Sequence, residues 1–217
     1  MRKLIAQILT ALLFLIAVSA SALTNAEKTY QIEVIVFSHI TAKGVDSEKW
    51  PWTPTDYKPN GNAASIFPVA RNSLILSSEQ RQLAKQPGYQ ILLHMAWRQK
   101  IANPRNAQPI HIFGGNIYNN SGRLIGQATY GGQPYSASKT WQVNGTITPS
   151  LIRYIDLKFN LLFAQPLASL PTADKSNNVE GNFAYFRLNQ SRRMRSRELN
   201  YLGHPLYGVL VKVVPVA

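Results

Sequence analysis

Residues 151–163 have the sequence LIRYIDLKFNLLF, and this stretch is the clearest guide to the fold. From Ile155 to Leu161 every second side chain is apolar, while Asp156, Lys158 and Asn160 occupy the positions between them. Successive side chains of a β-strand point to opposite faces, so this alternation predicts a strand with one buried and one exposed face. Such strands are typical of antiparallel sheets, which pack one face on a core.

Further stretches rich in β-branched and aromatic residues predict the remaining strands. Glycine- and asparagine-rich segments, such as residues 119–122 and 131–134, separate them and predict turns or loops. Gly114-Gly115 predicts a bulge or a close approach of the backbone, and Pro149 predicts a hairpin or bend before Leu151. The predicted strands cover residues 30–37, 89–99, 110–118, 140–148, 151–163, 183–188, 192–199 and 206–214.

One short helix is predicted to begin at Ser77 and to end at Pro87-Gly88. In a capping box, Ser77 would accept a hydrogen bond from the backbone N–H of Gln80, whose side chain would reach back. The sequence as a whole therefore predicts an α+β fold, mainly an antiparallel β-sheet with one short helix packed on it.

Residues 1–22 have the pattern of a secretory signal peptide. Arg2 and Lys3 precede an apolar stretch, and Ala20-Ser21-Ala22 supplies the small residues that a signal peptidase recognises. An uncleaved anchor is the alternative, but about 15 apolar residues fall short of the roughly 20 that a spanning helix needs. We therefore expect export to the periplasm, with a single domain over residues 23–217. The chain has no cysteine, which excludes disulfides and attachment through a lipidated cysteine.

The charge is strongly positive. Lys and Arg number 23 against 10 Asp and Glu, giving a net charge of +13, and removing Arg2 and Lys3 with the signal lowers it to +11. Such a charge indicates anionic partners. In the periplasm these partners include peptidoglycan carboxylates, lipopolysaccharide phosphates and acidic proteins. Nucleic acid is the usual partner of a basic protein, but the predicted export argues against it here.

Five arginines gather near the C-terminus and form the main candidate binding site. In a strand over residues 193–197, alternate arginines would project from one face at a repeat of roughly 6.6–6.8 Å. A guanidinium presents a planar fork of donors that matches a carboxylate or phosphate, so such a row would grip successive stem-peptide carboxylates. The alternative is a solvated edge strand whose charges block aggregation. The candidates are Arg187, Arg192, Arg193, Arg195 and Arg197.

Trp50, Trp52 and Tyr57 form a second candidate site in the proline-rich segment that follows residue 39. Exposed aromatic rings there would stack on sugars or contact a partner protein. The alternative is that the two tryptophans fold back over the core, since bulky aromatic side chains are usually buried.

Nothing in the sequence indicates an enzyme or a cofactor. Ser136 and Lys139 match the Ser-x-x-Lys pattern of penicillin-binding enzymes, but the Lys-Thr-Gly companion is missing. The acidic residues are scattered, and the histidines lack metal-ligand spacing. His94, within a predicted strand, is expected to be a hydrogen-bonded structural residue, and His204 is expected to bond within its turn.

The chain resembles the CsiV family of periplasmic peptidoglycan-binding proteins. The resemblance rests on residues 32–37, on Tyr89 to Gln99 and on Gly145 to Phe159, and most specifically on Arg192-Arg193-Met194-Arg195-Ser196 through Glu198-Leu199, Tyr201-Leu202, His204-Pro205 and Gly208. Two positions depart from the family pattern: Gly203, where a polar residue is usual, and Asp156, where histidine is common. The resemblance implies a non-catalytic wall-binding protein. It also implies support of cell-wall synthesis through the lipoprotein activator of a bifunctional penicillin-binding synthase.

Overall fold

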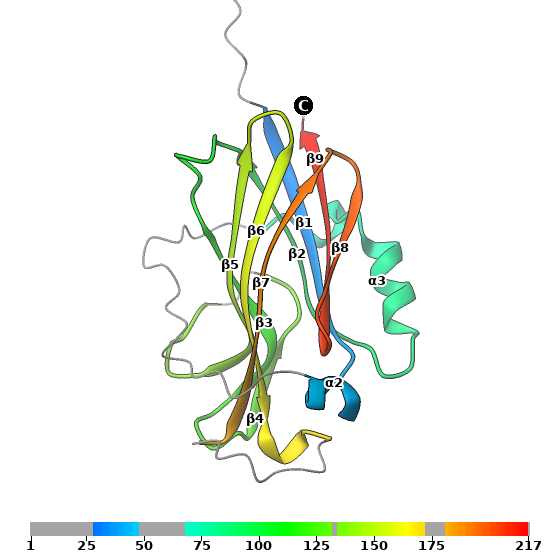
Figure 1. Ribbon diagram of the computed structural model, residues 1–217, viewed down its shortest axis with the longest axis vertical. Coiled ribbons are helices and arrows are strands. Elements are labelled where there is room, and N and C mark those ends of the chain that lie inside the picture. Colours follow the sequence, from blue (N-terminus) through cyan, green and yellow to red (C-terminus); the bar gives the residue numbers. More distant parts are fainter. Residues whose placement is uncertain (1–27, 48–67, 132–133, 172–180, 217) are drawn as a thin grey trace, which may run out of the picture.

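The computed structural model describes residues 28–47, 68–131, 134–171 and 181–216. Two antiparallel sheets make up most of this part (Figure 1). One sheet has the strand order β2-β1-β9-β8, and the other has the order β4-β3-β5-β6-β7. The strands are β1 (Thr29–Ser38), β2 (Gln90–Lys100), β3 (Ile110–Tyr118), β4 (Leu124–Ala128), β5 (Thr140–Leu151), β6 (Ile155–Pro166), β7 (Phe183–Met194), β8 (Leu199–Gly203) and β9 (Tyr207–Val216).

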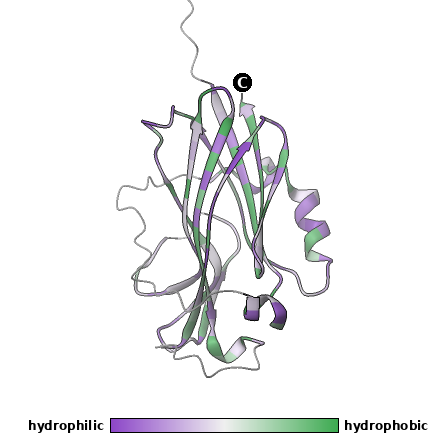
Figure 2. Cartoon of the chain, viewed as in Figure 1, coloured by the Kyte–Doolittle hydropathy of each residue, from purple (hydrophilic) through white to green (hydrophobic). Residues whose placement is uncertain are grey.

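The two sheets lie face to face and enclose a shared hydrophobic core. Ile32 and Val34 of β1 belong to the same buried cluster as Leu157 and Phe159 of β6. Along the strands, apolar and polar residues alternate as bands, as Figure 2 shows. The predicted alternation around Ile155 is therefore confirmed, and the predicted antiparallel fold takes the form of a sandwich.

The predicted helix is α3 (Ser77–Ala84), and it covers the outer face of the sheet that contains β1. Leu76 packs there with Ile35 and Phe37, and Leu83 packs against this cluster. A second helix, α2 (Ala42–Ser47), was not predicted, and 3₁₀ turns cover residues 71–73 and 167–169. No helix within the described residues is long and apolar enough to cross a membrane.

The predicted capping box is wrong. Leu76 is the N-cap residue, and no side chain of the helix itself bonds there. The cap comes instead from Glu33 of β1, whose carboxylate accepts hydrogen bonds from the backbone N–H groups of Ile75 (2.8 Å) and Leu76 (2.7 Å). A negative charge at a helix N-terminus is also favoured by the helix dipole. A residue distant in sequence thus replaces the local motif that Ser77 and Gln80 predicted.

The face that β2 presents to the core changes along the strand. Leu93 and alternate residues after it face the core. The register with β1 shifts just before Phe37, and this bulge moves Ile91 to the outer cluster under α3. Tyr89 stacks on Phe37 at 5.5 Å between ring centroids, so Tyr89 and Ile91 both pack on the outer face of this sheet.

β5 continues through Pro149 to Leu151, where the sequence predicted a break. Proline cannot donate to a ladder and is tolerated only where a strand edge is open. The neighbouring strand β3 begins at Ile110 opposite Ile147, so Pro149 lies beyond the end of that ladder. The turn between β5 and β6 occupies residues 152–154 instead.

The predicted strand over residues 192–199 is also wrong. β7 runs without interruption to Met194, and the chain then turns over residues 195–198 before β8 begins. Arg197 has a φ of 68°, in the left-handed region that ends an extended run. β8 and β9 pair closely, and the turn between them is residues 204–206.

Candidate functional site

Two turns bring basic side chains together at one end of the sandwich. The β5–β6 turn and the β7–β8 turn both lie at the end where β1 begins (Figure 1). The pairing of Ile155 with Met194 fixes the two turns side by side. We call the arginines of this end the basic tip: Arg153, Arg192, Arg193, Arg195 and Arg197.

A hollow of about 240 Å³ lies between the two turns. Arg153 and Tyr154 line it from the first turn, and Arg195 lines it from the second. The guanidinium of Arg153 lies 5.6 Å from the centre of the Tyr154 ring, a distance typical of a cation–π contact. Arg153 was not among the predicted site residues, because its turn was not predicted.

A larger hollow of about 500 Å³ opens on the outer face of the second sheet, and we call it the Asp156 pocket. Arg193 lies directly opposite Asp156 in the pairing of β6 with β7. Both residues line the pocket, together with Lys158 and Arg153. Three cations and one carboxylate therefore share this surface. The complete lining is Pro104, Ser150, Ile152, Arg153, Tyr154, Asp156, Lys158 and Arg193.

Arg192 belongs to the other side of β7. Its Nε donates to the side-chain oxygen of Asn200 on β8 at 2.9 Å. The side chain of Gln190 also reaches toward β8, where its amide donates a hydrogen bond to the Gly203 carbonyl at 3.1 Å. These two bonds tie the edge of one sheet to the edge of the other, so Arg192 has a structural contact as well as an exposed surface.

The predicted row of three arginines is wrong. Arg193 belongs to β7, whereas Arg195 and Arg197 lie in the turn, so no common strand face presents them. Arg187 lies six residues before Arg193 on β7, which corresponds to roughly 20 Å of extended chain. Its Nε donates to the side-chain oxygen of Asn160 at 3.0 Å, and it does not join the basic tip.

The tip arginines of β7 and its turn nevertheless point to solvent. Arg192, Arg193, Arg195 and Arg197 are exposed, and none of them forms an ion pair with a carboxylate of the described residues. Glu198, the acid within the turn, accepts the backbone N–H of Arg195 at 3.1 Å. β7 is also the edge strand of its sheet, so the aggregation-blocking role remains compatible with the fold.

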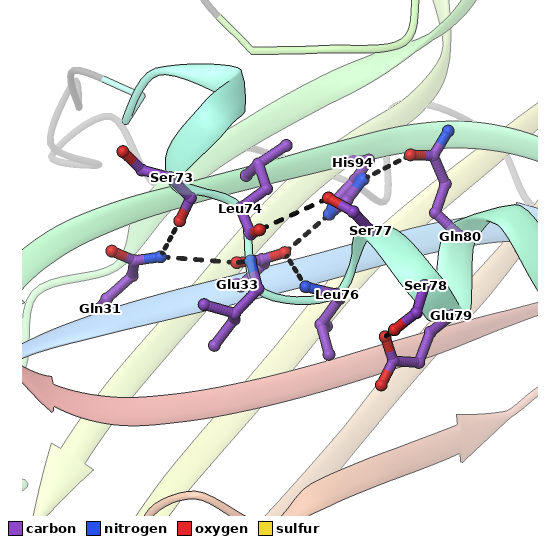
Figure 3. Close-up of polar contacts among 11 residues, drawn as sticks. Gln31, Glu33, Ser73, Leu74, Leu76, Ser77, Ser78, Glu79, Gln80 and His94 are labelled. Atoms are coloured by element: carbon purple, nitrogen blue, oxygen red, sulfur yellow. Dashed lines mark hydrogen bonds and ion pairs between the residues drawn. The ribbon is translucent and has the colours of Figure 1, made fainter.

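The one buried acid–base pair of the described chain lies on the other sheet (Figure 3). His94 Nε2 lies 2.8 Å from a Glu33 oxygen, and both side chains are fully buried. His94 Nδ1 lies 3.0 Å from the side-chain oxygen of Gln80 on α3. The prediction that His94 is a hydrogen-bonded structural residue is confirmed, as is that for His204, whose Nδ1 accepts the Leu206 N–H at 3.1 Å.

The remaining candidates do not assemble into a catalytic site in the described residues. The Ser136 hydroxyl bonds Ser138 at 2.9 Å rather than the Lys139 ammonium. No group of three or more histidine or carboxylate ligands suited to a metal occurs in this part of the chain. Trp50, Trp52 and Tyr57, as well as the predicted signal over residues 1–22, lie outside the described residues.

A family model described as the peptidoglycan-binding protein CsiV matches residues 53–216. The chain belongs to the CsiV family. The match includes both turns of the basic tip and the Asp156 pocket, whereas β1 with Glu33 precedes it. No curated protein and no solved structure matches significantly.

Membership in the CsiV family assigns the chain to a group named for binding peptidoglycan. That name describes binding rather than catalysis, and it implies a place in the cell envelope, where peptidoglycan lies. The family match thus confirms the resemblance inferred from the arginine-rich block.

Proposed function

We propose that the chain is a periplasmic, non-catalytic protein that binds peptidoglycan through the basic tip, with guanidinium groups holding stem-peptide carboxylates. The observation that carries the proposal is the meeting of two turns, which gathers exposed arginines with no carboxylate partner among the described residues. A guanidinium donates two parallel hydrogen bonds to a carboxylate, and a charge-assisted bond of this kind is roughly twice as strong as a neutral one. The proposed ligand therefore matches the exposed donors.

Co-sedimentation with purified sacculi tests this proposal. In the triple variant R193E/R195E/R197E three donors become three acids, and we expect its co-sedimentation to be abolished. The matched control is R81E/K85E/R123E, which makes the same change of charge on α3, just after it and in the β3–β4 turn. Binding that survives in the first variant, or falls equally in both, would contradict the assignment of the site.

A second candidate function is a protein-interaction module whose association with the wall is only electrostatic. The net charge of +13 supports it, since a charge of this size attracts any anionic polymer. Screening shortens from roughly 10 Å at 0.1 M salt to roughly 3 Å at 1 M. Binding that disappears at moderate salt, and that is equal for sacculi and an unrelated polyanion, would favour this module over a built site.

We also propose that the protein supports wall synthesis by contacting the lipoprotein activator of a bifunctional penicillin-binding synthase. The family resemblance supports this role, and the segment with Trp50 and Trp52 is the proposed contact surface. A pull-down from cross-linked envelopes tests it, with a W50A/W52A variant expected to lose the activator while still sedimenting with sacculi. Release of soluble muropeptides from sacculi by the purified protein would instead indicate a hydrolase.

A further inference from the structure

The carboxylate of Asp156 has no partner among the described residues, and it lies in a pocket whose other charged lining residues are basic. It projects from β6 on the outer face of the second sheet, where the neighbouring apolar positions point to the core. Its carboxylate forms no hydrogen bond or ion pair with any described residue, and its Oδ1 is buried from solvent although the residue as a whole is half-buried. Buried polar atoms are satisfied in the great majority of cases, so an unsatisfied carboxylate oxygen requires an explanation.

The cations around Asp156 come from three separate places in the sequence. Arg193 is its cross-strand neighbour on β7, Lys158 lies two residues along β6 on the same face, and Arg153 comes from the β5–β6 turn. All of them line the same pocket of about 500 Å³, which falls in the size range of ligand sites. Three positive groups and one negative group give this surface an excess of positive charge, with a single carboxylate among its described lining residues.

This arrangement suits neither a simple anion nor a metal ion. A ligand with carboxylates alone would pair with the cations but would leave Asp156 unsatisfied and opposed to its charge. A hard cation such as Ca²⁺ takes six to eight oxygen ligands, whereas Asp156 is the only carboxylate among the described residues that line the pocket, where three cations accompany it. A group that carries both an ammonium and a carboxylate offers a partner of opposite charge to Asp156 and to the arginines at once.

We infer that the Asp156 pocket binds the free end of a diamino acid in an uncrosslinked stem peptide, with Asp156 accepting hydrogen bonds from the ammonium while Arg193 and Arg153 hold the carboxylate. The inference rests on the proposed function and names the chemical group that this surface selects. A cross-link formed through this amino group converts the ammonium into a neutral amide, so the pocket discriminates against stems whose amino group has been used in a cross-link. The protein would therefore concentrate on wall that still has free amino groups.

Acetylation of the free amino groups of sacculi tests this inference, because it removes the ammonium and leaves the carboxylates unchanged. We expect native protein to bind acetylated and washed sacculi about tenfold more weakly than untreated sacculi, as loss of one charge-assisted pair predicts. The variant D156N should bind untreated sacculi about as weakly as native protein binds acetylated ones, and acetylation should not weaken it further. E79Q is the matched control, because it removes one acid on α3 and should respond to acetylation like the native protein.

The outcomes separate this inference from the proposed function. If native protein binds untreated and acetylated sacculi equally, the ammonium is not recognised and the inference is overturned, while wall binding stands. If D156N binds weakly but still loses a further tenfold on acetylation, Asp156 only positions Arg193 and the inference is also overturned. If native protein does not bind sacculi at all, the proposed function fails first. Thermal unfolding of D156N, expected to match the native curve, confirms that the variant is folded.

Discussion

Glu33 and Asp156 are both acids on the outer face of a sheet, but they differ in burial and in the partners of their carboxylates. Glu33 is fully buried under α3 and accepts hydrogen bonds from two backbone N–H groups, with His94 at 2.8 Å. Asp156 has no partner among the described residues, although three cations line its pocket. A buried acid with partners is thus part of the fold, whereas an acid with no described partner beside a hollow points to a ligand.

Removing Glu33 should have the largest effect on stability. In E33A, the N–H groups of Ile75 and Leu76 and the ring of His94 lose their acceptor while α3 still covers them. Breaking such a buried charged network costs about 3–5 kcal/mol. Urea unfolding should show this loss in E33A, whereas D156A should lie within about 1 kcal/mol of the native protein. Equal losses in the two variants would remove the distinction between the acids.

Reversing the charge of Arg153 should weaken wall binding without weakening the fold. Arg153 lines both hollows of the tip, and hydrogen bonds to charged groups contribute about 1.5–3 kcal/mol, so R153E should lower sacculus affinity about ten- to a hundredfold. R123E, in the β3–β4 turn, is the control and should bind normally. The measurement is a sedimentation isotherm at fixed ionic strength, and normal binding by R153E would exclude the β5–β6 turn from the site.

His204 is another buried polar residue, and its effect on stability depends on pH. Burial lowers the pKa of His204 to about 4, and the nearby charge of His39 adds to this shift. The unfolded chain takes up this proton near pH 6.5, so the folded state loses stability as the pH falls from about 6.5 toward 4, and the loss levels off below that. The slope should reach at most about 1.4 kcal/mol per pH unit.

Urea unfolding at pH 7, 6 and 5 measures this slope. H204Q keeps an acceptor for the Leu206 N–H but cannot take up the proton, so its stability should fall less steeply than that of the native protein. Parallel pH profiles for the two proteins would show that His204 is not the group that titrates.

Removing the Ser77 hydroxyl should have the smallest effect. Replacing a true N-cap serine by alanine costs about 1 kcal/mol. In this structure Glu33 makes the cap, and the Ser77 hydroxyl donates only a long bond to the Leu74 carbonyl at 3.4 Å. S77A should therefore change the free energy of unfolding by less than about 0.5 kcal/mol. A loss of 1 kcal/mol or more in the free energy of unfolding, measured in urea, would show that Ser77 caps the helix after all.

Local patterns in the sequence predicted most strands but not the places where distant strands meet. The alternation after Ile155 determines which side chains face the core, and it holds in β6. The turn at residues 195–198 contains no glycine or proline that would predict it, and the residue with positive φ is Arg197. An extended arginine run and a turn were therefore equally compatible with the local sequence.

The site depends on which strands pair and in which register, and no local pattern in the sequence gives this information. Arg153 and Asp156 join the predicted arginines only because β6 pairs with β7 in the register that places Asp156 opposite Arg193. Glu33 had a visible signal, since it is the single acid in the apolar stretch YQIEVIVF over residues 30–37. An acid at such a position is buried with its partners, but the partners on α3 and β2 could not be identified from that stretch.

The most direct test of the binding surface is a titration of the ¹⁵N-labelled protein with soluble, uncrosslinked muropeptides, followed through amide chemical shifts. We expect the largest shifts at residues 150–158 and 190–198, the two segments that form the basic tip and the Asp156 pocket, with little change in α3 or the β3–β4 turn. Shifts centred on α3, or spread evenly over the surface, would contradict a peptidoglycan site at this end of the sandwich.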